Sequence, residues 1–367
     1  MDDLVAEVAH LDQAGALASL VWSSGSIPMS DRAKMLVRAD GRVSGTIGGG
    51  CLEAEIVNAG RQVLEAGRPH FTSYTMTEQQ AGESGLNCGG SVRIFTELAS
   101  PVLFARLLQA RQERQNCVVA TLLRTDTSVQ PGAGQILYYA GGERWGSLGT
   151  PAVDDLVAEQ AGQILATERG QLLELDLSSQ QKEALGLVDK AKVEAFVEPF
   201  SPPPVLYVFG GGHVGGQIAA LAKNTGFRVV VIDDRPLFAT AQRHRTADEC
   251  LIAQMDGVFD DLPIDEQSYI VAATRGHQHD EIVVEGALAT RARYIGMLGS
   301  ERKKMVLWKR ILQRGADRVR LDQVWAPIGL NIGADNPEEI AVSVVAELIK
   351  VRRGVRKEWK TKKIAIS

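Results

Sequence analysis

The sequence has little cysteine, few aromatic residues and no long apolar run. Four cysteines among 367 residues cannot form a disulfide scaffold, so we expect any important cysteine to be a reduced thiol in the cytoplasm. No apolar segment approaches the roughly 20 residues needed to cross a bilayer, and the first residues do not resemble a secretory signal. The net charge of −5 argues against a chain that binds nucleic acid over its whole surface. We therefore predict neither a membrane nor a nucleic-acid partner.

What is present is the composition of a globular protein large enough for two or three domains. Hydrophobic residues make up 45% of the chain, which suffices for full hydrophobic cores. The run Val197–Pro204 contains three consecutive prolines, through which neither a helix nor a central strand is expected to pass. We predict a first domain at residues 1–198, a Pro-rich linker at 199–204, a second domain at 205–351 and a basic tail at 352–367.

The first domain contains a weak internal repeat with a spacing of about 102 residues. Ala18–Val21 resembles Ala120–Leu123, and Gly45–Gly48 resembles Gly146–Gly149. Each copy predicts strands followed by a helix, near Leu52–Leu64 and Val153–Leu165. Only the first copy carries a Gly-Gly-Gly-Cys sequence, which favours that copy as the site. Chance similarity is the alternative to a duplication.

The second domain alternates strand-like and helix-like segments. The short apolar runs of strand length are Val205–Phe209, Arg228–Ile232, Tyr269–Ala273 and Arg293–Gly296. The helical patterns are Val214–Lys223, Glu301–Arg314 and Pro337–Val351. Strands separated by helices predict an α/β domain, a Rossmann-like parallel sheet with helices on both faces.

A glycine motif of the form G-x-G-x-x-G lies between the first strand and the first helix of this domain. In dinucleotide-binding proteins the first glycine makes a tight turn, the second admits a pyrophosphate and the third lets helix and strand pack closely. An acid pair about 20 residues further on stands where a ribose-binding acid is expected. We predict a nucleotide-like ligand, although the glycines could instead only close a turn. The predicted contacts are Gly210, Gly211, Gly212, His213, Val214, Gly215, Asp233, Asp234 and Arg235.

Two further polar segments follow strands of the same sheet. Because ligands of such sheets bind at the carboxyl ends of the strands, we expect these segments to line the same crevice. The predicted contacts there are Arg275, Gly276, His277, Gly299 and Ser300. A metal at His277, His279 and Asp280 is a weaker alternative, because no fourth ligand is evident, and we predict no metal site.

Two of the cysteines stand in glycine turns. Cys51 follows three glycines at the start of a predicted helix, a position that favours the thiolate form and leaves room for a ligand. Cys88 stands in a second glycine turn, whereas Cys117 and Cys250 stand in apolar runs typical of buried structural cysteines. We predict Cys51 and Cys88 as the reactive residues, with a small residue in a tight turn as the alternative for each. The predicted cofactor contacts beside them are Gly48, Gly49, Gly50 and Glu53.

Several separated motifs resemble one known family, in that family's order. They are Gly25–Pro28, Lys34–Val37, Gly45–Glu55, Leu86–Gly90, Phe209–Gly216, Asp233–Pro236, Thr274–Asp280, Tyr294–Ser300 and Pro327–Ala334. Together they resemble the signature of the XdhC/CoxI family of xanthine dehydrogenase accessory factors. Met29–Arg32 departs from the pattern, because family members more often carry basic and small residues there, and this puts the anion contacts of that loop in doubt.

The resemblance implies a maturation factor rather than a turnover enzyme. Such proteins bind molybdenum cofactor, as molybdopterin or its dinucleotide, shield it during sulfuration and deliver it to a hydroxylase such as xanthine dehydrogenase. The implied partners are the molybdenum hydroxylase apoenzyme, a cysteine desulfurase and a second copy of the chain in a homodimer. We expect the cysteines and the glycine phosphate loop to hold opposite ends of one ligand, between the two domains.

Two competing functions do not need Cys51. One is an NAD-dependent oxidoreductase, in which the Rossmann domain binds NAD(H) and His277 is the one candidate base. The other is a regulatory module that senses a nucleotide.

Overall fold

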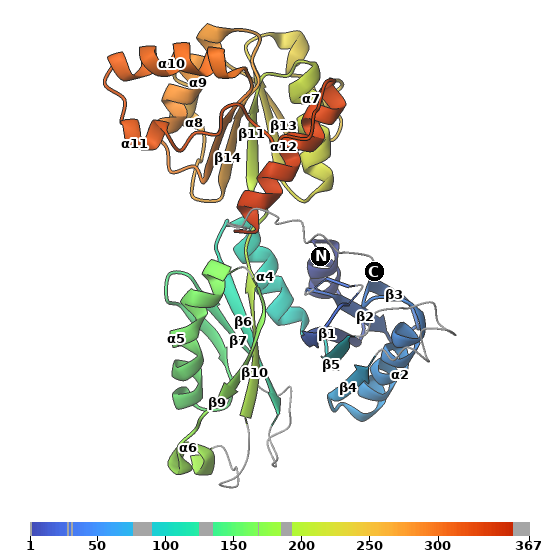
Figure 1. The fold of residues 1–367 in the computed structure, drawn as a ribbon. Helices are drawn as coiled ribbons and strands as arrows, with labels where there is room; N and C mark the ends of the chain where they lie inside the picture. The colour runs from blue at the N-terminus through green and yellow to red at the C-terminus, as the bar shows by residue number, and fades with distance from the viewer. Residues whose placement is uncertain are drawn as a thin grey trace, which may run out of the picture. The chain divides into compact units, whose positions relative to one another are not determined.

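The computed structural model describes residues 2–27, 29–30, 32–75, 90–124, 135–167, 169–184 and 193–354. The chain divides into two compact units, Met1–Pro202 and Pro203–Ser367 (Figure 1). No helix in the described part of the chain is both long enough and apolar enough to cross a membrane.

The first unit consists of two lobes with the same strand order. The first lobe contains α1 (Asp2–Ala9), β1 (Gly15–Ser24), β2 (Lys34–Arg38), β3 (Val43–Thr46), α2 (Gly50–Ala66), β4 (His70–Thr75) and β5 (Ser91–Leu98). Its strands pair in the antiparallel order β3-β2-β1-β5-β4.

The second lobe repeats this arrangement. It contains α4 (Pro101–Gln112), β6 (Cys117–Arg124), β7 (Gln135–Tyr139), β8 (Arg144–Ser147), α5 (Pro151–Thr167), β9 (Gln171–Leu175), α6 (Ser179–Ala184) and β10 (Val193–Phe200). Its strand order, β8-β7-β6-β10-β9, matches that of the first lobe strand for strand. The predicted duplication is therefore confirmed.

The two sheets face each other, and each carries a helix on its outer face. In the first lobe Leu52 and Ile56 of α2 are buried against Met35 of β2, and α5 covers the second sheet in the same way (Figure 1). On the inner faces Leu36 and Leu137 belong to one apolar cluster. Helices α1 and α4 contribute to the same cluster, so the core inside the two sheets contains these two helices and is shared by both lobes.

An ion pair joins equivalent positions of the two lobes. Arg93 of β5 and Glu194 of β10 lie 101 residues apart in the sequence, at corresponding places in the repeat. The guanidinium donates two hydrogen bonds to the carboxylate, at 2.9 and 3.2 Å. The lobes thus meet around an approximate two-fold axis on which one copy supplies the cation and the other the anion.

The boundaries of the linker and tail differ from those predicted. Strand β10 continues through Pro199 to Phe200, where it pairs with β6, so residues 199 and 200 are strand rather than linker. Proline is tolerated here because the pairing with β9 ends at Val197, which leaves the other edge of the strand without a backbone partner. Helix α12 (Pro337–Arg352) includes Arg352, the predicted first residue of the tail, and residues 355–367 lie outside the described part of the chain.

The second unit is a parallel five-stranded sheet. Its elements are β11 (Val205–Phe209), α7 (His213–Asn224), β12 (Arg228–Asp233), η1 (Pro236–Phe238), β13 (Glu249–Ile252), α8 (Val258–Asp261), β14 (Ser268–Ala272), α9 (His277–Leu288), β15 (Tyr294–Met297), α10 (Glu301–Gln313), α11 (Arg318–Leu321) and α12. The strand order is β13-β12-β11-β14-β15. Helices α7 and α12 cover one face and α8 to α11 the other, so the predicted Rossmann-like fold is confirmed (Figure 1).

Candidate functional site

The glycine loop before α2 is held by hydrogen bonds to the carboxylate of Glu53. Gly48, Gly49 and Gly50 all have positive φ, between 66° and 90°, which side chains rarely adopt. One oxygen of Glu53 accepts hydrogen bonds from the Thr46 hydroxyl at 2.5 Å and from the Gly49 amide at 3.1 Å. Glu53, a predicted cofactor contact, therefore holds the loop itself in place.

The second lobe has an equivalent hydrogen-bonded carboxylate but no thiol beside it. Asp154, at the position of Glu53, accepts hydrogen bonds from the Leu148 amide at 2.6 Å and the Ser147 hydroxyl at 2.9 Å. The residue at the position of Cys51 is Ala152. Because the loop and helix form equally well around an alanine, the scaffold does not require a cysteine.

Cys51 is an exposed free thiol in the first turn of α2. There the thiol stands near backbone N–H groups that no helical carbonyl satisfies, at the end of the helix that favours negative charge. Cys117 is buried in β6 and donates a weak hydrogen bond to the carbonyl of Phe200; burial raises its pKa to about 12. Cys88 lies outside the described residues.

A pocket of about 560 Å³ opens beside this glycine loop. Gly48 and Gly49 form one wall, and Arg32 and Lys34 are the charged residues among those that line it. No described residue lining the pocket carries a carboxylate. Its volume is that of a small-molecule site, and its lining favours an anionic ligand.

In the second unit, the packing of the fold requires the first and third glycines of the motif, Gly210 and Gly215. A Cβ at Gly210 would overlap the carbonyl oxygen of Ala273, and one at Gly215 would overlap that of Gly210. These are the tight turn and the close helix–strand contact that the sequence predicts. The second glycine of the motif is Gly212, and no heavy atom lies within 4 Å of the place where its Cβ would stand, so the space predicted for a pyrophosphate is open. Gly211, the residue between the first two glycines, packs against the carbonyl oxygen of Phe238.

Asp233, the predicted ribose acid, has its hydrogen-bonding capacity taken up within the protein. One carboxylate oxygen accepts from the backbone N–H and Nε of Arg235, at 3.0 and 2.8 Å. The other accepts from the Gly211 amide and the Arg235 guanidinium, both at 2.9 Å. These four bonds fill a carboxylate's usual capacity. They outweigh the burial of the side chain, which by itself raises the pKa, and hold the Asp233 pKa at about 2.

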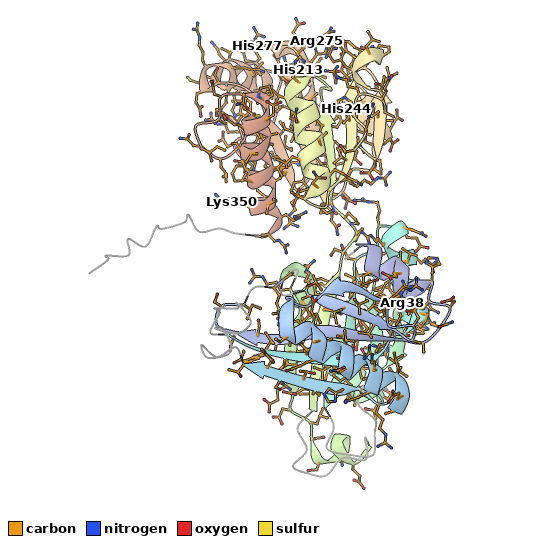
Figure 2. The ribbon with its side chains drawn as sticks, turned by 90° about the vertical axis from the view of Figure 1, so that its right-hand side faces the viewer. Arg38, His213, His244, Arg275, His277 and Lys350 are labelled. Carbon is orange, nitrogen blue, oxygen red and sulfur yellow. The ribbon has the colours of Figure 1, made fainter. Side chains whose placement is uncertain are left out.

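The other residues predicted to line the crevice either contact one another or begin helices. Asp234 accepts a hydrogen bond from Arg275 at 2.8 Å. His213 and His277 are exposed first residues of α7 and α9, whose glycine caps, Gly212 and Gly276, make no side-chain hydrogen bond. Figure 2 shows His213, Arg275 and His277 at the same end of this unit, opposite Lys350.

The last predicted pair, Gly299 and Ser300, belongs to the start of α10. The Ser300 hydroxyl caps the helix by accepting from the Lys303 amide at 3.2 Å. Val214 is half-buried against the core under α7.

Comparison with known proteins decides the family. The model of the XdhC Rossmann domain matches residues 206–348, and the model of the XdhC and CoxI family matches twice, at 9–75 and 110–176. The chain belongs to the XdhC/CoxI family. The two matches of one model coincide with the two lobes.

Two relatives and one solved structure match most of this chain. The chain is 27% identical to a protein of Bacillus subtilis described as a probable subunit of xanthine dehydrogenase, over 92% of this chain and 93% of that protein. It is 23% identical to the molybdenum cofactor insertion chaperone PaoD of Escherichia coli, over 92% and 83% of the two chains. The crystal structure of a xanthine dehydrogenase from Bacillus halodurans has the same fold, with a TM-score of 0.76, 23% identity and coverage of 98% and 97%.

A buried ion pair in the XdhC Rossmann domain was not predicted from the sequence. Asp280 is fully buried; one oxygen accepts from the amide and hydroxyl of Thr274, and the other pairs with the Lys303 ammonium. These bonds tie the loops after β14 and β15 together and leave Asp280 unavailable to a metal. No group of three or more metal-ligating side chains occurs among the described residues.

Lys34 of the first XdhC/CoxI lobe was also missed as a site residue, although it stands in the family motif. A signal was present in the repeat, where the equivalent residue is Gln135. The cation and the thiol are thus both peculiar to the first lobe at these two positions.

Proposed function

We propose that this protein is a maturation factor that binds molybdenum cofactor and delivers it to a molybdenum hydroxylase. The observation that carries the proposal is the divergence of two otherwise matching lobes. The scaffold is common to both, but Lys34 and Cys51 of the first lobe correspond to Gln135 and Ala152 of the second. The first lobe therefore carries a cation and a soft nucleophile at two positions where the second lobe forms the same fold with neutral side chains.

The residues around the pocket fit the chemistry of this cofactor. Molybdopterin is an anionic phosphate ester with soft sulfur atoms, and when bound it supplies a molybdenum centre. Arg32 would hold the phosphate end, and Lys34, whose ammonium is bonded to Glu198 and Ser19, would add positive potential there. Cys51 is not one of the residues that line the pocket, but it follows the glycines that do, and its thiol would face the sulfur-rich end, because soft ligands match soft thiolates. In this proposal Cys51 also carries the sulfur for sulfuration as a persulfide received from a cysteine desulfurase. Cys88 stays a predicted partner in that step.

The contacts of Asp233 in the second unit do not favour the predicted NAD-dependent oxidoreductase. The space beside Gly212 is open, but Asp233, the predicted ribose acid, is bound on all sides by the protein's own donors. The ribose of a dinucleotide would have to displace these donors to bind Asp233 in the usual way. Arg275, His213 and His277 stay predicted contacts for an anion at the crevice, and homodimerisation stays a prediction.

The test is cofactor retention by the full chain purified from a molybdenum-replete host. Molybdenum and molybdopterin are measured per chain in the unmodified protein, in Cys51→Ala and in Cys250→Ala, which removes a half-buried thiol of the second unit. We expect the unmodified protein and Cys250→Ala to retain the cofactor, and Cys51→Ala to lose about nine-tenths of it. Full retention by Cys51→Ala would remove the thiol from contact with the cofactor. Absence of molybdopterin from the unmodified protein would refute the function.

A further inference from the structure

Four polar residues meet between the two sheets of the first unit. Glu97 of β5 and Glu198 of β10 occupy equivalent positions of the repeat, as do Lys34 and Gln135, the first residues of β2 and β7. The Lys34 ammonium donates to Glu198 at 2.7 Å, and the Gln135 amide donates to Glu97 at 2.8 Å. Each lobe therefore reaches across the approximate two-fold axis to the carboxyl group of the other.

The two crossing contacts differ in charge. Lys34 is a cation held by Glu198 and by the Ser19 hydroxyl at 2.8 Å, whereas Gln135 is neutral. One ammonium therefore faces two carboxyl groups. The other polar residues that line this space, Ser19 and Thr121, carry no charge.

The space between these groups admits almost no water. It is a cavity of about 20 Å³, enough for one water molecule, and its walls are mainly apolar, with Leu17 and Leu107 among them. Glu97 and Lys34 are both more than nine-tenths buried. Two carboxylates beside one ammonium would leave an uncompensated negative charge in these surroundings, at a high cost in free energy.

The contacts of the two carboxyl groups favour Glu97 over Glu198 as the one that keeps a proton. Glu198 has the ammonium as a direct partner, whereas Glu97 has only an amide. Burial, with a smaller contribution from Glu198, raises the pKa of Glu97 to about 8 against the opposing effects of Lys34 and Gln135. Among the residues that line the cavity, Lys34 and Glu198 are the other charged groups that face it from any element.

We propose that Glu97 is a proton-binding site that controls the charge which Lys34 contributes to the candidate pocket. Lys34 lines both the inner cavity and the pocket beside the glycine loop. While Glu97 is neutral, Glu198 alone balances the ammonium. When Glu97 loses its proton, the ammonium faces two carboxylates, and the potential that attracts an anion in the pocket falls. The effect on the pocket rests on the proposed function, whereas the proton site itself does not.

The proton is tested on the full chain without ligand. Infrared difference spectra between the unmodified protein and Glu97→Gln isolate the carbonyl band of a protonated carboxyl group. We expect this band at about pH 6.5, its loss with a midpoint near pH 8, and its absence from Glu97→Gln at every pH. Gln135→Lys, which gives Glu97 an ammonium like that of Glu198, lowers the midpoint by about one pH unit or more. Identical spectra for the unmodified protein and Glu97→Gln at the lower pH would overturn the proposal.

The coupling to the pocket is tested with the cofactor. The full chain is loaded with molybdenum cofactor and equilibrated at about pH 6.5 and about pH 9.5, on either side of the expected midpoint, and the amount retained is measured. We expect the unmodified protein to lose affinity about threefold or more at the higher pH, and Glu97→Gln to lose less than half of that factor. An equal loss in both proteins would overturn the coupling. If the unmodified protein retains no cofactor at either pH, the proposed function fails, and the infrared result still decides whether Glu97 holds a proton.

Discussion

The hydrogen bonds around Asp233 predict a measurable and local loss of stability in Asp233→Asn. An amide keeps one acceptor oxygen but turns an NH₂ group toward donors that the carboxylate satisfied. The pKa of Asp233 is lowered from 3.8 to about 2, which corresponds to about 2.4 kcal/mol of stabilisation at neutral pH. Because the folded-state pKa lies below the unfolded value, this contribution is complete well above pH 4. It falls to about half near pH 3 and is mostly lost by pH 2.

Hydrogen exchange measured peptide by peptide gives the local readout. We expect the amides of β11 and β12 to exchange about 60-fold faster in Asp233→Asn at pH 7, since these strands carry the turn that Asp233 holds. Asp234→Asn is the matched control, because its hydrogen bond goes to the half-exposed Arg275 side chain and is worth about 0.5 kcal/mol or less. Unfolding measurements in acid test the direction of the pH dependence. The difference in the free energy of unfolding between Asp233→Asn and the unmodified protein should shrink as the pH falls from about 4 to about 2. Equal exchange in the Asp233 and Asp234 variants, or a difference that grows in acid, would refute the reasoning.

Three further predictions concern carboxyl groups that are buried or that hold a loop by hydrogen bonds. Because the folded-state pKa of Glu97 lies above its unfolded value, the free energy of unfolding should fall by up to about 1.4 kcal/mol per pH unit between pH 4.5 and 8. Urea titrations at several pH values measure this slope, which should be absent from Glu97→Gln. Glu53→Ala and Asp154→Ala should each destabilise their own lobe by about 1–3 kcal/mol, but only Glu53→Ala should reduce cofactor retention; equal retention by both would contradict the assignment of the site to the first lobe. Asp280→Asn should lower the free energy of unfolding by about 3 kcal/mol, because it leaves the Lys303 ammonium without its carboxylate. At about 2–4 °C per kcal/mol this lowers the Tm clearly, so a Tm within about 2 °C of the unmodified protein would contradict the importance of this ion pair.

The sequence predicts local features of this fold well. The buried strands of the second unit appear as continuous apolar runs because helices cover both faces of a parallel sheet. The glycines before α2 predict a turn because the backbone there has positive φ. The spacing of the repeat predicts two equivalent lobes, because the same apolar and glycine positions serve the same packing twice.

Roles that depend on distant contacts could not be predicted in this way. Asp233 has the spacing of a ribose acid, but the Arg235 side chain donates hydrogen bonds to it, and only the folded chain shows this. Lys34 and Glu198 are 164 residues apart, and no periodic pattern relates them. The comparison of the two lobes reveals such pairs, because it shows where equivalent positions have acquired different chemistry.

The ion pair between Arg93 and Glu194 shows how the sequences of the two lobes can diverge within one chain. In a symmetric dimer of identical chains, any residue on the two-fold axis meets its own copy, so a lone arginine there would face another arginine. Once both halves are parts of a single polypeptide, each half mutates separately, and such a position can become complementary. A protein built from two first halves would therefore carry repulsion at its centre, and the second half, although it has no thiol in its loop, cannot be exchanged for a copy of the first.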